Sequence, residues 1–102
     1  TNKFSFVGFL PPKSSARKKF LSNNINNEYT IILYESCHRI IKLIEEIIII
    51  MGEKRVISVC KELTKIHEKS ITNPAVIVRK ELLKMKIKGE FVVMISKRDF
   101  IF

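Results

Sequence analysis

Cysteine, glycine and long apolar runs are all scarce in this sequence, and each scarcity excludes a class of protein. The 102 residues include only two cysteines, too few for a disulfide framework, so a reduced, cytoplasmic setting is expected. Gly8, Gly52 and Gly89 are the only glycines and lie far apart, which excludes a glycine-rich phosphate-binding loop. The longest uninterrupted apolar run, Ile47 to Met51, is far short of the roughly 20 residues that a membrane span needs. No signal-peptide pattern is visible, and no membrane partner is expected.

Side chains suited to metal binding or nucleophilic catalysis are also few. The soft ligands Cys37, His38, Cys60 and His67 show no CxxC or HxxxH spacing, so no metal site is expected. Cys37 and His38 are neighbours in sequence, and on a helix their side chains would diverge rather than form a catalytic pair. Ordinary core cysteines and surface histidines explain these residues better.

Positive charge is the most prominent feature that is present. Lysine and arginine outnumber the acids by 19 to 10, which gives a formal net charge of +9. A surplus of this size points to an anionic partner, usually a nucleic acid, although the abundance of Lys, Ile and Asn is also typical of a genome-wide compositional bias. The hydrophobic content of 46% excludes a disordered tail, and the length allows a single domain over residues 1–102.

Apolar periodicity predicts an α/β domain. Two strand–helix–strand units joined by short loops imply a parallel core with right-handed crossovers. Strands are predicted over Phe4–Leu10, Tyr29–Tyr34, Arg55–Cys60, Glu68–Thr72 and Phe91–Ser96, and helices are predicted after Ser14-Ser15, over Arg39–Met51 and over Ala75–Met85.

The same patterns predict which faces are buried. Phe4–Leu10 is expected to be a buried strand, and Tyr29–Tyr34 is β-branched on both faces, as in a strand that is covered on both sides. In the helix Arg39–Met51, Glu46 is expected on the wet side with Lys42 and Glu45.

The first helix is short and basic. Ser14 and Ser15 are expected to cap it, and its cations are expected mostly on its outer face. Those cations are the candidate contacts to RNA phosphates, and the alternative is a solvated helix face: Lys13, Arg17, Lys18 and Lys19.

Tyr34 to Arg39 forms a strand-to-helix turn, in which Ser36 is a good N-cap. If the second and third strands are parallel, the loops that follow them emerge at one edge of the sheet. Polar residues would then converge there and favour a small-molecule site, whereas the alternative is that Ser36 only starts a helix. The converging residues would be Glu35, His38, Glu62, Thr64 and Lys65.

Four segments, taken together and in order, carry a family resemblance. They are Gly8-Phe9-Leu10-Pro11, Tyr34-Glu35-Ser36-x-His38-Arg39, Glu62-Leu63-Thr64-Lys65-x-His67-Glu68 and Lys88-Gly89-Glu90-Phe91. From about Phe4 to Ser96 the sequence resembles the ribosomal RNA small subunit methyltransferase I family. That family is the 2′-O-ribose methyltransferase branch of the tetrapyrrole-methylase superfamily.

The resemblance implies a fold and an activity. The fold would be the smaller, C-terminal domain, an α/β domain whose five-stranded mixed sheet has its last two strands antiparallel to the rest. Family members bind S-adenosylmethionine between this domain and an N-terminal one, and methylate the 2′-oxygen of a cytidine in small-subunit (16S) ribosomal RNA. The chain would therefore be the C-terminal half of a two-domain enzyme, inactive alone, with its own N-terminal domain, the small (30S) ribosomal subunit and, as in other members, a second copy as partners.

The resemblance also implies which residues line the cofactor cleft: Tyr34, Glu35, Ser36, Lys61, Glu62, Leu63, Lys88, Gly89 and Glu90. Two positions depart from the family pattern, because Cys37 stands where proline is common and Lys61 where arginine is common. Attack by a 2′-hydroxyl needs a base, for which His38, Lys61 and Lys65 are the titratable candidates, and the catalytic residue stays unassigned.

Two alternatives remain open at this point. One is a non-catalytic, basic RNA-binding module, and the other is a different branch of the tetrapyrrole-methylase superfamily, acting on a tetrapyrrole or a protein side chain.

Overall fold

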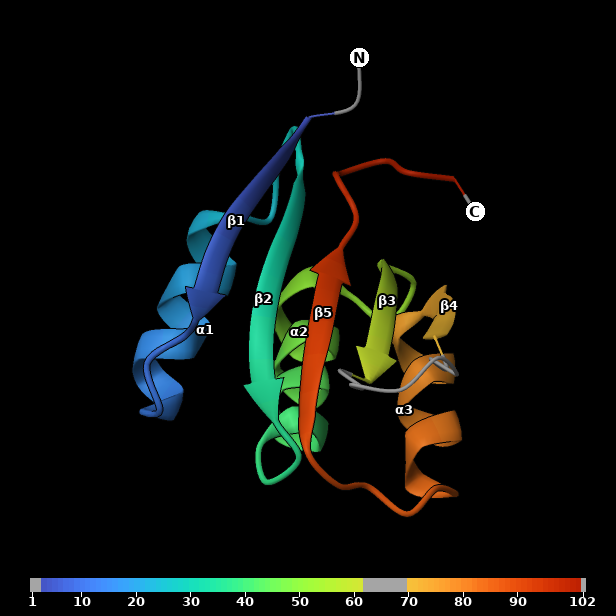
Figure 1. Ribbon diagram of the computed structural model, residues 1–102. Helices are drawn as coiled ribbons and strands as arrows, with labels where there is room; N and C mark the ends of the chain where they lie inside the picture. The colour runs from blue at the N-terminus through green and yellow to red at the C-terminus, as the bar shows by residue number, and fades with distance from the viewer. Residues whose placement is uncertain (1–2, 62–69, 102) are drawn as a thin grey trace.

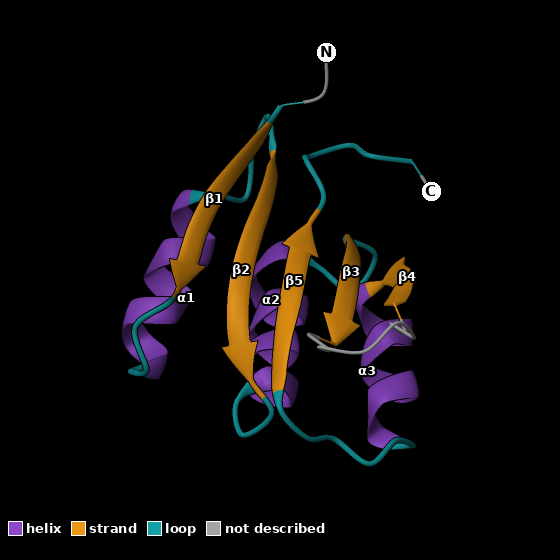
Figure 2. Cartoon of the chain, viewed as in Figure 1, coloured by secondary structure: helices purple, strands orange, loops and turns teal. Residues whose placement is uncertain are grey.

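A mixed sheet with helices packed on one face forms the framework of the protein (Figures 1 and 2). The computed structural model describes residues 3–61 and 70–101. The elements are β1 (Phe4–Phe9), α1 (Ser14–Asn23), β2 (Thr30–Ser36), α2 (Ile40–Met51), β3 (Val56–Lys61), β4 (Ser70–Pro74), α3 (Ala75–Leu83) and β5 (Glu90–Ile95).

The order of the five strands across the sheet is β1-β2-β5-β3-β4. β1 and β2 are parallel neighbours, and β5 lies between β2 and β3, antiparallel to both. Because β4 is antiparallel to β3, the last two strands of the chain both run against the first three. The mixed sheet that the family resemblance implied is confirmed. Local sequence patterns alone do not predict that β5 separates β2 from β3.

Within residues 3–61 and 70–101, the helices cover one face of the sheet and nothing covers the other. Along β2, Ile31 and Leu33 are buried on the helix side, whereas Ile32 and Tyr34, which point the other way, are half-buried. β1 lies at the edge, and its three phenylalanines are more than half exposed. The predictions of a buried first strand and of a second strand covered on both faces are therefore wrong. β-Branched residues suit any pleated strand, so their presence on both faces did not require two covering layers.

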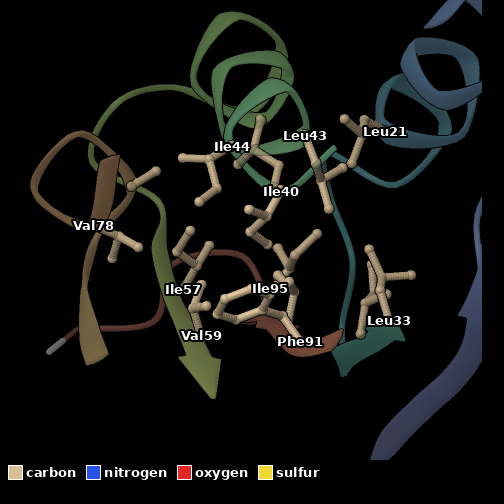
Figure 3. Close-up of a cluster of buried hydrophobic side chains, with 14 of the residues drawn as sticks. Leu21, Leu33, Ile40, Leu43, Ile44, Ile57, Val59, Val78, Phe91 and Ile95 are labelled. Carbon is tan, nitrogen blue, oxygen red and sulfur yellow. The ribbon is translucent and has the colours of Figure 1, made fainter. Parts of the chain in front are cut away.

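Helix α2 supplies the centre of the core. Ile40, Leu43, Ile44 and Ile47 are fully buried between α2 and the sheet (Figure 3). Each such side chain contributes roughly 1.5–3 kcal/mol, which outweighs the few tenths that isoleucine loses as a helix former. Gly52 ends the helix as predicted, with a φ of 99° and its N–H donating to the Ile48 carbonyl at 3.0 Å.

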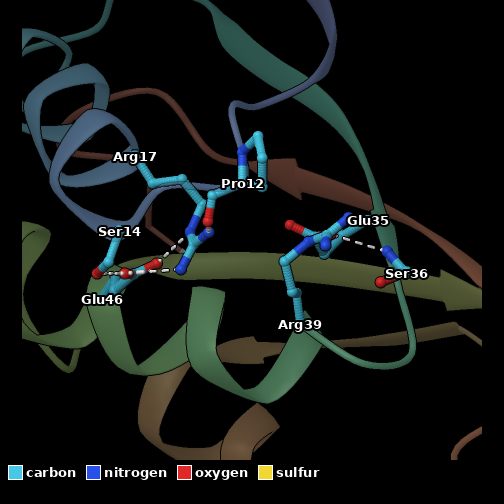
Figure 4. A network of polar contacts seen from close by, with 7 residues as sticks. All are labelled: Pro12, Ser14, Arg17, Glu35, Ser36, Arg39 and Glu46. Carbon is cyan, nitrogen blue, oxygen red and sulfur yellow. Dashed lines mark hydrogen bonds and ion pairs between the residues drawn. The ribbon is translucent and has the colours of Figure 1, made fainter.

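A buried ion pair joins α1 to α2 (Figure 4). The Arg17 guanidinium donates to the Glu46 carboxylate at 2.8 and 3.1 Å, and the Arg17 and Glu46 residues are 3% and 1% exposed. Arg17 also donates to the Pro12 carbonyl, and the Ser14 hydroxyl donates to Glu46. The predictions of an outward Arg17 and a wet Glu46 are wrong. Ser14 does not cap α1 as predicted, because its hydroxyl binds Glu46 and Lys13 occupies the N-cap position.

The protonation of Glu46 is linked to folding. Burial alone would raise the pKa of Glu46, but hydrogen bonds from Arg17 and Ser14 and the charges of Arg17 and Lys42 more than offset it, so the pKa lies below its ordinary value. A depressed folded-state pKa contributes stability above the unfolded-state value of about 4.3, and that stability is lost as the pH falls through the folded value.

We therefore expect the free energy of unfolding to decline below about pH 5, with Glu46 contributing to the decline. Urea titrations between pH 3 and pH 7 measure it. The Glu46→Gln variant, although less stable at pH 7, should show a shallower decline in acid, because the group that takes up the proton is gone. An identical acid slope in the two proteins would contradict this account.

Candidate functional site

The ends of β2 and β3 and the beginning of β5 meet at one edge of the sheet. Ser36 pairs with Glu90, and Lys61 pairs with Phe91, so the end of β2 with the loop that follows it and the end of β3 flank the loop that enters β5. This strand-end edge brings together the described residues that the sequence assigned to a cofactor cleft: Tyr34, Glu35, Ser36, Lys61, Lys88, Gly89 and Glu90. Glu62 and Leu63, which were assigned to the same cleft, lie outside the described residues, as do Thr64, Lys65 and His67.

A backbone hydrogen bond ties two of these loops together. The Cys37 N–H donates to the Gly89 carbonyl at 2.9 Å. Gly89 has a φ of 81°, a conformation that side-chain-bearing residues adopt at a cost, and a Cβ added there would lie 3.9 Å from Lys61 Cε. Glycine therefore suits this position because of its backbone conformation and not because space is short. That conformation lets the loop before β5 lie against the turn after β2 and beside Lys61.

Ser36 is the last residue of β2 and does not cap α2. The residues Cys37–Arg39 form a turn, the Arg39 N–H donates to the Ser36 carbonyl at 3.1 Å, and α2 starts at Ile40 with no side-chain cap. The predicted N-cap is therefore wrong. The Ser36 Oγ is buried, and no hydrogen-bond partner for it lies within the part of the chain that the structure describes. A buried hydroxyl of this kind is a ready donor and acceptor for a bound molecule.

Glu35 is buried beneath the turn. Its carboxylate accepts the Ser36 N–H at 2.8 Å and the Arg39 Nε–H at 3.2 Å (Figure 4). The same oxygen serves both bonds, so Glu35 joins the end of the strand to the residue before the helix. Through these two bonds, Glu35 holds the turn in place. The i,i+4 spacing of Glu35 and Arg39 was the sequence signal for this pair, and sequence reasoning missed it.

The remaining assigned residues differ in their surroundings. Tyr34 lies on the face opposite the helices, with its ring centroid 5.3 Å from that of Phe6 and 5.5 Å from that of Phe9. Lys88 and Glu90 are exposed, and Lys61 is half-buried. His38 is exposed in the turn after β2. The strand-end edge thus offers ammonium groups, a carboxylate, an imidazole and an orphan hydroxyl to a ligand.

The basic residues of α1 form a separate group. Lys13, Lys18 and Lys19 are exposed, whereas Arg17 is engaged by Glu46. Lys13 immediately precedes α1, which begins at the end of the sheet where β1 and β2 finish (Figure 1). Three of the four predicted phosphate contacts are therefore available to an anionic partner, and the fourth is a structural ion pair.

The described residues contain neither a metal-ligand cluster nor a membrane-spanning helix. Across residues 3–61 and 70–101, no group of three His, Cys, Asp or Glu side chains could hold a metal ion. In the same ranges, no helix is long and apolar enough to cross a membrane.

Comparison with known proteins gives relatives in sequence and in structure. No family model matches the chain. Over 98 residues it is 39% identical to "Ribosomal RNA small subunit methyltransferase I" of Haemophilus influenzae and 43% identical to the protein of that name from Buchnera aphidicola. These matches cover 94% and 93% of the chain but only 35% and 33% of the relatives, so the chain spans about a third of their length.

Solved structures show the same fold at low identity. The match to the methyltransferase CobJ covers 95% of this chain and 42% of the CobJ chain, with a TM-score of 0.66 and 12% sequence identity. The match to cobalt precorrin-4 methyltransferase, CbiF, covers 94% of this chain and 41% of the CbiF chain, with a TM-score of 0.63 and 15% sequence identity. Identities this low establish the shared fold alone.

Proposed function

Because the chain is similar over nearly its whole length to a C-terminal portion of ribosomal RNA small subunit methyltransferase I, we propose that it serves S-adenosylmethionine-dependent methylation of small-subunit ribosomal RNA. We propose further that the methyl group goes to the ribose 2′-oxygen of a cytidine. In this account the chain is the C-terminal half of a two-domain enzyme, and its strand-end edge is one wall of the cofactor cleft.

The observation that carries the proposal is the convergence of the ends of β2 and β3 and the start of β5 at the strand-end edge. The Cys37–Gly89 hydrogen bond joins the turn after β2 to the loop before β5 in a preformed surface, and the Ser36 Oγ has no partner there within the described residues. When bound, S-adenosylmethionine would supply an electrophilic methyl group on a sulfonium. The residues present fit such a molecule, because its hydroxyl groups, its carboxylate and its cationic centre match the Ser36 hydroxyl, the Lys61 and Lys88 ammonium groups and the Glu90 carboxylate.

The chain's own residues give the cleft its rigidity. Glu35 holds the turn after β2 through the Ser36 N–H and Arg39, and Gly89 allows the β5 loop to approach that turn. A ribose hydroxyl is a weak nucleophile until a base removes its proton. His38 and Lys61 are the titratable groups on this edge within the described residues that could serve as a base, and neither is assigned that role.

Methyl transfer by the longer protein tests the proposed function. We expect the longer protein, with the region upstream of Thr1 restored, to transfer labelled methyl groups from S-adenosylmethionine to isolated small ribosomal subunits. The 102-residue chain alone should transfer none. Mapping the label to a base, or finding labelled porphyrinoid in place of RNA, would contradict the proposal.

Charge reversal on α1 tests the proposed RNA contact. We expect the variant with Lys13→Glu, Lys18→Glu and Lys19→Glu to bind small-subunit RNA more weakly, with a shallower salt dependence. Each lost phosphate contact should reduce the slope of log K against log salt by about 0.7–0.9. Filter binding between 50 and 300 mM KCl measures both the affinity and its salt dependence.

A matched control separates this surface from general charge. The variant with Lys80→Glu, Lys84→Glu and Lys86→Glu makes the same charge change in and just after α3, where all three side chains are exposed. Equal losses of RNA affinity in the two triple variants would contradict a specific contact through α1.

A further inference from the structure

A hollow lies at the opposite end of the sheet from the strand-end edge. Its volume is about 570 Å³, and the residues around it come from the start of β1, the start of β2 and the segment after β5. Thr30, at the first position of β2, lines this hollow, whereas Ser36, at the last position, belongs to the strand-end edge. The hollow therefore has no part in the proposed cofactor cleft.

Hydrogen bonds of the backbone and of side chains shape the hollow. The segment after β5 runs beside the start of β2 (Figure 1) and is held there because the Arg98 N–H donates to the Asn27 carbonyl at 2.8 Å. The Asn27 side chain donates to the Ser96 carbonyl at 3.0 Å, and Arg55 donates to the Asn27 Oδ1 at 2.6 Å. This network joins the loop before β2 to the end of β5, so the walls are built into the fold.

The lining of the hollow combines aromatic rings with cations. Phe4, Tyr29 and Phe100 line it and remain 64%, 43% and 45% exposed. Lys3 and Lys97 also line it, and the Lys3 Nζ lies 5.7 Å from the centroid of the Tyr29 ring. Exposed aromatic faces beside ammonium groups are the combination with which proteins stack nucleobases while neutralising the adjacent phosphates.

Polar groups in and beside the hollow suit the edge of a base or a ribose. A smaller cavity of about 190 Å³ adjoins it, sharing Thr30, Met94 and Phe100, and is also lined by Ser96. The buried Ser96 Oγ has no hydrogen-bond partner in the described part of the chain. Glu28 lines the larger hollow, and its carboxylate can accept a hydrogen bond from an exocyclic amino group.

We propose that this hollow binds an unpaired nucleobase of an RNA strand, stacked on Phe4, Tyr29 or Phe100, with Lys3 and Lys97 beside the flanking phosphates. The inference rests on the proposed function, since the strand it would hold is the substrate RNA of that function. Its distance from the strand-end edge makes it a holding site for the strand and not a place of reaction.

Charge favours RNA over a second copy of the chain as the occupant. A symmetric pairing of two such faces would bring the Lys3 and Lys97 groups of both copies together, between chains that each carry a net charge of +9. An RNA phosphate removes that repulsion. An unpaired base is required because the rings need an exposed base face, which a duplex does not offer.

Tyrosine fluorescence tests the proposal directly, because the chain has no tryptophan and only two tyrosines. In the 102-residue chain carrying Tyr34→Phe, Tyr29 is the single reporter. We expect an unstructured 12-nucleotide RNA to quench Tyr29, and a blunt-ended RNA duplex of 12 base pairs to leave its emission unchanged. Phe4→Ala and Phe100→Ala should each weaken binding of the single strand about five- to a hundredfold.

Control variants keep the test decisive. Ile49→Ala removes an apolar side chain that is largely exposed on α2, and it should leave the affinity unchanged. Circular dichroism checks that every variant is folded. Unchanged affinity in both Phe4→Ala and Phe100→Ala, or equal quenching by duplex, would overturn the proposal. A dimer in sedimentation equilibrium that Phe4→Ala dissociates would assign the face to a second copy. Because quenching needs no cofactor, a failure of methylation by the longer protein leaves this readout intact.

Discussion

The Arg17→Ala variant should lose about 3–5 kcal/mol of its free energy of unfolding, one of the largest effects expected from a single substitution. The Glu46 carboxylate would be left in a buried position without the cation that donates to it at 2.8 and 3.1 Å. An unpaired buried charge costs far more than the intact pair contributes, because its desolvation is no longer offset. Urea unfolding at pH 7, followed by circular dichroism, measures the loss.

Two comparisons isolate the buried pair. Lys18→Ala, at the next position on the same helix, removes an exposed cation and should change the free energy of unfolding by no more than about 0.5 kcal/mol. The double variant Arg17→Met, Glu46→Met removes both charges and should recover most of the lost stability. An Arg17→Ala variant as stable as Lys18→Ala would contradict the buried ion pair.

The Gly89→Val variant of the longer protein should lose about a hundredfold in kcat/KM for methylation of small ribosomal subunits. A β-branched residue cannot easily adopt a φ of 81°, so the β5 loop would move and the Cys37–Gly89 hydrogen bond would be lost or lengthened. A displacement of about 1 Å at a site that positions reactants is enough for a loss of this size. The measurement is initial-rate methyl transfer at several concentrations of small ribosomal subunits with saturating cofactor.

Gly52 provides the matched control for Gly89. It also has a positive φ, 99°, with open space where a Cβ would stand, but it ends α2 away from the strand-end edge. Gly52→Val imposes a comparable backbone strain and should lower thermal stability while largely preserving kcat/KM at 20 °C. Equal losses of kcat/KM in both variants would show that the Gly89 effect is one of general destabilisation.

The order and type of the helices and strands follow from local patterns in the sequence. The helix predicted over Arg39–Met51 is observed over Ile40–Met51, because its apolar residues recur at the helical period and Gly52 marks its end. The last strand was equally plain, since Phe91 to Ile95 is bounded by a glycine turn. Such signals depend on neighbours a few residues apart, which is why they were readable without knowledge of the tertiary fold.

The exposure of individual side chains depends on partners that are distant in the sequence, and for these side chains the local patterns gave wrong predictions. Arg17 and Glu46 each sit where a helix wheel shows a polar face, and only the packing of α1 on α2 turns those faces toward each other. Ser14 and Ser36 both suit an N-cap, yet Ser14 donates to Glu46 and Ser36 ends a strand. The apolar residues of β1 and β2 indicated strands but not whether a second layer covers them.

The candidate site was half predictable. Parallel strands end at the same edge of a sheet, and this rule correctly predicted that the ends of β2 and β3 lie at one edge. The Lys88–Glu90 loop arrives between them because β5 lies in the middle of the sheet, a strand order that was not predicted. The family resemblance implied only that this loop lines the same cleft. The hollow beside Tyr29 depends on where the segment after β5 folds back, and no local pattern encodes that position.

The most direct test of the strand-end edge as a cofactor wall is an NMR titration. S-Adenosylmethionine would be added to the 15N-labelled longer protein, and the amide shifts of this region followed residue by residue. The account predicts that the largest changes within this region fall on Ser36, Cys37, Gly89 and Glu90, while the amides around Gly52, which lie away from that edge, stay unchanged. Saturable binding that leaves the amides of Ser36 and Gly89 unmoved would contradict it.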